Sequence, residues 1–375
     1  MLGVVQYAAL GLAAISICLS AWAIRRDTPL DWRFAVPQVV GTEAAPFFQT
    51  VLDYKAATGQ AHSPSIARTD DGFDVLWFEG SKEAQADVDI FAASVTGGDG
   101  TWESDTPRRI VTRGALGAAF APRQLVVTLG NTIENESLRG ALYSTVVSVG
   151  GWAMASIAAI RMDGDMPQQA RKLNLSPLLN RSHLVKSPMV EYADGSYALP
   201  VYFEMGQMHG VLARFGRDGR VRDTARIDGP NLHPIQPMIV PLSATHAVAF
   251  LRDFDIALGK LLISHTRDGG QSWSSVRATE IANPSAPVAA LPLGGERILI
   301  AMNDDPARPD DLRLSLSEDG GETWRLLHSF TPEEGALRYP MLRDLHGGEF
   351  ALTYSQGTKR GIKAHVFNTA WLATK

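Results

Sequence analysis

From residue 47 onward, apolar side chains occur in short runs separated by turn-forming residues. No segment shows the apolar periodicity of a long helix, and no Gly/Ser linker or low-complexity stretch interrupts the runs. Short apolar runs bounded by Gly, Asp and Asn are typical of β-strands joined by hairpins. The pattern therefore predicts an all-β domain.

One hairpin pattern, an apolar run, a turn and a second apolar run, recurs along this region. Its six copies are PSIARTDDGFDVLWF, RQLVVTLGNTIEN, SPMVEYADGSYALPVYF, PMIVPLSATHAVAFL, PVAALPLGGERILIAM and PMLRDLHGGEFALTY, with turns at Gly72, Gly130, Gly195, Ser243, Gly295 and Gly348. A repeat of about 50 residues with four short strands is the size of a propeller blade. Six copies predict a six-bladed β-propeller. Because the second copy is polar after its turn, five and seven blades remain alternatives.

The N-terminal segment differs from the rest of the chain. Residues Val4–Ile24 are 21 uncharged, mostly apolar residues, followed by Arg25 and Arg26. A helix of this length can cross a hydrocarbon core of about 30 Å. The small residues Ala21 and Ala23 offer a signal-peptidase site as the alternative. We therefore divide the chain into a signal anchor or signal peptide (1–26), a linker (27–46) and the propeller (47–375).

The same segment bears on localisation. Arg25 and Arg26 alone favour a cytoplasmic location for the residues that follow, but large domains can translocate regardless of such charges. We expect a cell-envelope protein, anchored in the inner membrane and facing the periplasm or the outside. If the segment is cleaved, the expectation is a secreted protein.

Composition and charge exclude several classes of function. The net charge is -5 and no Lys/Arg cluster is interleaved with aromatic residues, which argues against a nucleic-acid partner. Cys18 is the only cysteine, so the propeller can form no internal disulfide. The histidines lack metal-ligand spacing, and no dinucleotide or P-loop fingerprint is present. The sequence thus predicts neither metal nor cofactor.

Two nearly identical octapeptides lie 51 residues apart. They are Thr266–Trp273 (TRDGGQSW) and Ser317–Trp324 (SEDGGETW). Their Asp residues, Asp268 and Asp319, can accept hydrogen bonds from nearby backbone N–H groups, and the glycines permit positive φ. Trp273 and Trp324 are expected to pack between neighbouring sheets. The octapeptides are therefore predicted to be structural turns.

These octapeptides are Asp boxes, and residues 60–370 resemble bacterial predicted neuraminidases, relatives of the exo-α-sialidases. The resemblance implies catalytic groups at the mouth of the central channel. In that family a Tyr nucleophile with a Glu partner, an Asp acid/base and three arginines that bind the substrate carboxylate are contributed by different blades. A phenol replaces the usual carboxylate nucleophile because the anomeric carbon itself carries a carboxylate.

Carried over position by position, the resemblance implies three catalytic residues. Tyr339, before the last hairpin, matches the nucleophile, and Glu204, after the third hairpin, matches its partner. Asp87, in the loop after the first hairpin, matches the acid/base, with Asp89 as the alternative. Each residue also has a purely structural interpretation: Tyr339 as a packed strand residue, Glu204 as an exposed strand end and Asp87 as part of a solvated loop.

For anion binding, the resemblance implies Arg252 and Arg308, with Arg313 and Arg343 as alternatives to Arg308. His62 stands where the family has its first arginine, which puts sialic acid itself in doubt. His62 could donate to an anion or to a sugar hydroxyl, or serve a structural role, and Lys186 carries the same two interpretations.

Together these features predict a glycoside hydrolase of exo-α-sialidase type that acts on a terminal acidic or nonulosonic sugar of a glycan. One alternative is a catalytically silent propeller that binds a glycan or a protein at the cell envelope. Another is a polysaccharide lyase or different glycosidase, in which His62 and Tyr339 act as base and acid. The hydrolase hypothesis requires Asp87, Glu204, Tyr339 and Arg252 to converge on one mouth.

Overall fold

A computed structural model describes residues 2–26, 29–37, 41, 44–57, 59–98, 100–176 and 180–375. The chain forms two compact units, Met1–Asp31 and Trp32–Lys375. The first contains α1 (Leu2–Arg26), 25 residues long. Within the described residues, α1 is the one helix long and apolar enough to span a membrane, a property that signal sequences share.

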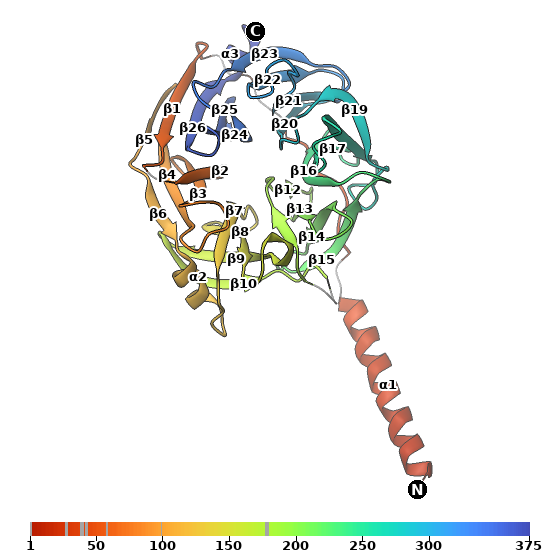
Figure 1. Ribbon diagram of the computed structural model, residues 1–375. Helices are drawn as coiled ribbons and strands as arrows, with labels where there is room; N and C mark the ends of the chain where they lie inside the picture. Colours follow the sequence, from red (N-terminus) through yellow and green to blue (C-terminus); the bar gives the residue numbers. More distant parts are fainter. Residues whose placement is uncertain are drawn as a thin grey trace. The chain divides into compact units, whose positions relative to one another are not determined.

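The second unit consists of six antiparallel sheets arranged as blades around a centre (Figure 1). This confirms the predicted six-bladed β-propeller. Strands are given from the centre outward: the first blade is β2 (Gln60–Arg68), β3 (Gly72–Gly80), β4 (Asp89–Gly98) and β5 (Thr101–Ser104), with β6 (Arg108–Val111) also on β4, and the second is β7 (Thr128–Glu134), β8 (Ala141–Val147), β9 (Ser156–Asp163) and β10 (Met166–Lys172). The third blade is β11 (His183–Val185) and β12 (Val190–Glu191), β13 (Tyr197–Phe203), β14 (His209–Phe215) and β15 (Val221–Ile227), and the fourth is β16 (Pro234–Pro241), β17 (Ala247–Asp253), β18 (Lys260–Thr266) and β19 (Arg277–Ala282). The fifth blade is β20 (Ala289–Gly294), β21 (Arg297–Met302), β22 (Leu312–Ser317) and β23 (Arg325–Phe330), and the last is β24 (Arg338–His346), β25 (Glu349–Gln356), β26 (Gly361–Asn368) and β1 (Phe48–Lys55). Three short helices, α2 (Arg113–Ala119), η1 (Trp152–Met154) and α3 (Thr369–Ala373), complete the unit.

The ring is closed by pairing the first strand with the last. β1 runs antiparallel to β26, with Phe48 opposite Phe367 and Lys55 opposite Gly361. The last blade therefore combines both ends of the propeller sequence, and β1 covers an edge of β26 that would otherwise be unpaired.

Three of the innermost strands share a bulge that prepares the site. In β2, β16 and β24, the residue before a proline has positive φ: Ser63 at 55°, Gln236 at 54° and Tyr339 at 56°. The ladder to the second strand shifts register at each of these points. Proline has no N–H to donate to a ladder, and a bulge redirects the side chains next to it. The X-Pro pairs thus turn these side chains away from regular sheet positions.

Five of the six predicted hairpin turns lie where expected, and the one at Gly130 does not. Gly130 lies inside β7, and the turn to β8 spans residues 135–140. A Cβ on Gly130 would lie 2.9 Å from the Trp152 ring, so this glycine is required by a close packing contact. The Gly130 turn is a wrong prediction, although the hairpin itself exists.

The Asp boxes form the expected turns, between β18 and β19 and between β22 and β23. The Asp319 carboxylate accepts hydrogen bonds from Ser317 Oγ (2.7 Å), Glu322 N (3.1 Å) and Thr323 N (2.9 Å). Trp324 packs on the core between the fourth and fifth blades, with its ring 5.8 Å from that of Phe250. Asp268 and Trp273 have equivalent positions in the preceding blade.

We expect Asp319→Ala to lower the free energy of unfolding by about 1–2 kcal/mol, because its hydrogen bonds hold the turn. Bonds from Thr323 lower the pKa of Asp319 to about 2. A lowered pKa in the folded state stabilises above the unfolded value of about 3.9 and the gain is lost as the pH falls towards 2. Urea denaturation should therefore show a smaller difference in the free energy of unfolding between the wild type and Asp319→Ala at pH 3 than at pH 7. Glu318→Ala is the neighbouring control, and an equal loss in both variants would contradict the prediction.

Part of the segment predicted as a linker packs on the propeller. Phe34 is buried, donates its N–H to Ala244 O (2.7 Å) and contacts the Tyr192 ring in a tilted arrangement, with ring centroids 4.9 Å apart. Trp32 lies so close to Gly269 that a Cβ there would meet its carbonyl oxygen. The division at residues 26 and 46 stays a prediction, with residues 32–34 contributing to the core of the third and fourth blades.

Candidate active site

A cleft of about 50 Å³ opens where the inner strands begin. Its lining comes from the first, second, third, fourth and last blades: Glu83, Asn131, Thr145, Trp152, Leu184, Tyr202, Glu204, Gln236 and Tyr339. Three kinds of segment supply them: inner strands, the second strands β8 and β13, and the connections between second and third strands. Propeller topology therefore brings residues from five blades into one cleft.

Tyr339 occupies the bulge of β24. Its hydroxyl oxygen lies 3.4 Å from both Gln236 Nε2 and Arg252 Nη1, which donate to it. The His62 ring contacts the Tyr339 ring at a centroid distance of 4.3 Å. The phenol is thus oriented by donors from the fourth blade and by an imidazole from the first.

Glu204 directly follows β13 and faces the same cleft. Its N–H donates to Ser182 O (3.1 Å), which fixes the end of the strand. Burial raises the pKa of the Glu204 carboxyl, nearby Arg252 opposes this effect, and the charge of Glu83 adds to it. A carboxyl with a raised pKa is better suited to exchange protons near neutral pH.

The loop after β3 contributes Glu83 to the cleft lining, while Asp87 is engaged within the loop. Both Asp87 carboxylate oxygens accept hydrogen bonds from Ser81, from its N–H and its hydroxyl, each at 3.0 Å. These bonds lower the pKa of Asp87. Asp89, the alternative, pairs with Arg109 at 3.2 Å. Glu83 lines the cleft and forms an ion pair with Lys359.

Of the candidate arginines, Arg252 reaches Tyr339 and the others are engaged elsewhere. Arg308 is 56% exposed and lies 3.4 Å from Asp305 and 3.5 Å from Asp311. Arg313 pairs with Asp305 and with Asp304. Arg252 Nε is buried and has no hydrogen-bond partner among the described residues, so this side chain has donor capacity to spare.

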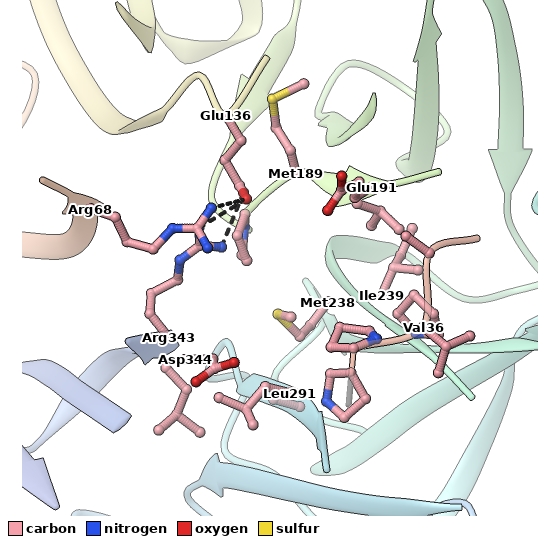
Figure 2. Close-up of a pocket in the computed structure, with 18 of the residues that line it drawn as sticks. Val36, Arg68, Glu136, Met189, Glu191, Met238, Ile239, Leu291, Arg343 and Asp344 are labelled. Atoms are coloured by element: carbon pink, nitrogen blue, oxygen red, sulfur yellow. Dashed lines mark hydrogen bonds and ion pairs between the residues drawn. The ribbon is translucent and has the colours of Figure 1, made fainter. Parts of the chain in front are cut away.

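Arg343 lies at the other end of the inner strands, in a separate pocket of about 420 Å³ (Figure 2). It binds Glu134 (3.1 Å) and Glu136 (3.0 Å), and Arg68 binds Glu136 (2.9 Å). Arg343 lies four positions after Tyr339, which is about 13 Å along a strand. Met189, Met238 and Leu291 are among the apolar residues that line this pocket. The two guanidinium groups pair with the two carboxylates.

His62 is nearly inaccessible, with 1% of its surface exposed. Its Nδ1 lies 2.8 Å from Ser355 Oγ, and its buried Nε2 has no partner in the described part of the chain. Burial is the largest of the causes that lower its pKa, followed by the charges of Lys359, Lys186 and Arg252. The imidazole is therefore neutral at physiological pH and lies against Tyr339, not at the cleft surface.

Several lining residues were not predicted from the sequence. Gln236 precedes Pro237 just as Tyr339 precedes Pro340, so the X-Pro pattern at the start of the hairpins was a usable signal. Glu83 and Trp152 belong to loops, and the sequence contains no comparable signal for them. Tyr339, Glu204 and Glu83 place a phenol and two carboxyls around one cleft, an arrangement that can support nucleophilic attack with proton transfer.

Comparison with known proteins agrees with the fold. A family model described as a BNR repeat-like domain matches residues 72–352. Among curated proteins, none matches the chain. The family match confirms the resemblance to sialidase-like propellers that the Asp boxes indicate.

Solved structures share the fold at low identity. A protein of unknown function from Dyadobacter fermentans is 14% identical, with a TM-score of 0.65 over 86% of this chain and 99% of that one. A Hadza microbial sialidase is 14% identical, with a TM-score of 0.60 over 83% and 66%. Trypanosoma rangeli sialidase is 11% identical, with a TM-score of 0.57 over 92% and 60%. The chain thus spans less than two thirds of the length of both sialidases.

Proposed function

Because the chain belongs to the BNR repeat-like domain family, we propose that its Tyr339 cleft is the active site of a glycoside hydrolase of exo-α-sialidase type. The substrate is a terminal acidic or nonulosonic sugar of a glycan. The observation that carries the proposal is the convergence of Tyr339, Glu204 and Glu83 on one cleft, with Arg252 donating to the phenol oxygen. The fold by itself does not specify an activity.

In this proposal Tyr339 is the nucleophile. Its hydroxyl oxygen bonds to the anomeric carbon while its proton passes to Glu204, whose pKa is raised by burial. The bond to the leaving-group oxygen breaks as that oxygen takes a proton from the acid. Water then releases the sugar, the acid now acting as base, and Tyr339 regains its proton. Two displacements retain the anomeric configuration.

The acid/base is assigned to the loop after β3. Asp87 follows from the family resemblance, and Glu83 follows from its position in the cleft. Both residues remain in the proposal. Asp87 would come within reach of the substrate only if the loop rearranged on substrate binding and the bonds from Ser81 broke. Arg252 provides a free donor for an anionic group, and Arg308 belongs to the proposed set by resemblance alone.

The N-terminal helix supports a location of this activity at the cell envelope. We propose that residues 1–26 anchor the protein in a membrane or direct its secretion, with the propeller outside the cytoplasm. Support comes from the length and composition of α1.

A test of the activity uses the full chain in mild detergent with a panel of fluorogenic sialosides, other nonulosonic glycosides, glucuronides and neutral galactosides. We expect release from at least one acidic glycoside and none from galactosides, with retained configuration in the first product seen by NMR. Silence across the panel from a folded protein would remove the hydrolase proposal.

One observation favours a second candidate, a propeller that binds a glycan without cleaving it. Asp87 and Arg308, which the hydrolase would use, are both engaged in bonds within their own loops. Binding of acidic glycans on an array, together with silence in the hydrolysis panel, would establish this function in place of hydrolysis.

A further inference from the structure

Lys186 is a buried ammonium at the centre of the propeller. It lies between β11 and β12, with 3% of its surface exposed, and its Nζ donates to Pro340 O at 2.9 Å. Among the described residues, no carboxylate forms an ion pair with it. Burial alone lowers the pKa of Lys186 to about 7. Lysines are rarely buried without a charged partner, because removing the charge from water is costly.

The ammonium lies directly behind the proposed nucleophile. Lys186 Nζ is 5.8 Å from the centroid of the Tyr339 ring, and its contact at Pro340 is with the adjoining residue of the same bulge. Gln236 Oε1 and Ser63 Oγ are buried nearby without partners in the described structure. Lys186 and Ser63 are buried and are not lining residues of the cleft; we call this polar layer, in which hydrogen bonds are incompletely satisfied, the floor of the cleft.

The charges around this floor are unequally paired. Glu83 forms an ion pair with Lys359, and the positive charge of Arg252 acts on Glu204, whose pKa it lowers against the effect of burial. His62 is neutral, so Lys186 remains as a positive charge without a counterion. An anion seated over Tyr339 would supply this counterion through a medium of low dielectric constant, where a unit charge acts over several ångströms.

We propose that Lys186 is a specificity-determining residue of the Tyr339 cleft: its ammonium, together with Arg252, selects a ligand with a carboxylate, and the selection is lost as the pH rises through neutrality. This inference rests on the site proposed above but concerns binding and not turnover. Lys186 acts through the floor and does not touch the reacting atoms.

The test measures binding of matched monosaccharides by calorimetry on the full chain. Glucuronic acid and glucose differ by one carboxylate, and N-acetylneuraminic acid is the third probe. For the wild type we expect both acids to bind about tenfold more tightly at pH 5.5 than at pH 8.5, the effect of one nearby charge, and to bind more tightly than glucose at pH 5.5. Lys186→Arg should keep the tight binding at pH 8.5, because arginine stays protonated.

Lys186→Met is the decisive variant. It removes a buried charge that has no carboxylate partner and leaves the Pro340 carbonyl without one donor, so we expect a folded protein by circular dichroism, with weak binding of the acids at both pH values. Glu204 also loses a proton as the pH rises and would weaken anion binding in the same direction. If the pH dependence persists in Lys186→Met, Glu204 or His62 causes it and the proposal is overturned.

Equal affinity of the wild type for glucuronic acid and glucose would overturn the proposal as well, and so would the absence of binding. Selective binding without hydrolysis in the panel would leave this inference intact and remove the hydrolase.

Discussion

A Tyr339→Phe variant is expected to lose at least about a thousandfold in kcat/KM on whichever acidic glycoside the wild type hydrolyses. The change removes one oxygen, which is the atom proposed to form the covalent bond, and loss of a nucleophile removes most of the chemical acceleration. The hydroxyl makes two long hydrogen bonds, so folding should change little. Kinetics and thermal unfolding on the same preparation separate the two effects.

Tyr197→Phe is the matched control, because Tyr197 lies on β13 outside the cleft lining. It should keep wild-type kcat/KM. Activity retained in Tyr339→Phe would place the nucleophile elsewhere, while equal losses in both variants would point to a general effect on folding.

Arg343→Met is expected to lower the free energy of unfolding by about 3–5 kcal/mol, the usual cost of removing one member of a buried ionic cluster. The Arg343 side chain is 9% exposed and binds both Glu134 and Glu136, and Figure 2 shows the pair with Glu136. Its loss leaves two largely buried carboxylates with Arg68 alone. Urea denaturation at pH 7 measures the cost, and Arg68→Met, at a side chain that is 30% exposed, should cost distinctly less.

The pH dependence has a definite sign. Burial raises the pKa of Glu134 and Arg343 opposes this, so Arg343→Met raises it further. A carboxyl with a raised folded-state pKa destabilises the protein as the pH climbs from its unfolded value to its folded value. The cost of Arg343→Met should therefore be smaller near pH 4.5 than at pH 7, and smaller again when Glu134 and Glu136 are both replaced by Gln. A cost below about 1 kcal/mol at pH 7 would show that the cluster contributes little.

The blades could be predicted from the sequence because their signals are local. In the Asp boxes, Asp, Gly and Trp meet the requirements of one turn within eight residues, so the pattern identified both turns. Gly130 shows the limit of such reasoning. Gly-Asn within an apolar run favours a hairpin turn, yet this glycine makes room for Trp152 from the next loop, a requirement that is not visible locally.

The candidate site was predictable only in part, for the same reason. Tyr339 and Glu204 occupy strand ends, and their positions follow from the hairpin register. The choice between Asp87 and Glu83 depends on the path of an eight-residue loop. That path is set by contacts of Glu83 with Gln60 on β2 and with Lys359 in the turn between β25 and β26. Arg343 was an alternative to Arg308 in the sequence, but its side chain lies at the far end of the inner strands.

The closure of the ring by β1 also constrains how the protein is made. Lys55 pairs with Gly361, 306 residues later in the chain. At synthesis rates of about 5–20 residues per second, β1 waits about 15–60 s before its partner strand exists. During this time both edges of β1 are unpaired, because β26 is its partner in the described sheets, and the last blade cannot form before β24, β25 and β26 exist. Closure of the ring therefore joins the first strand of the propeller to be synthesised to the last one.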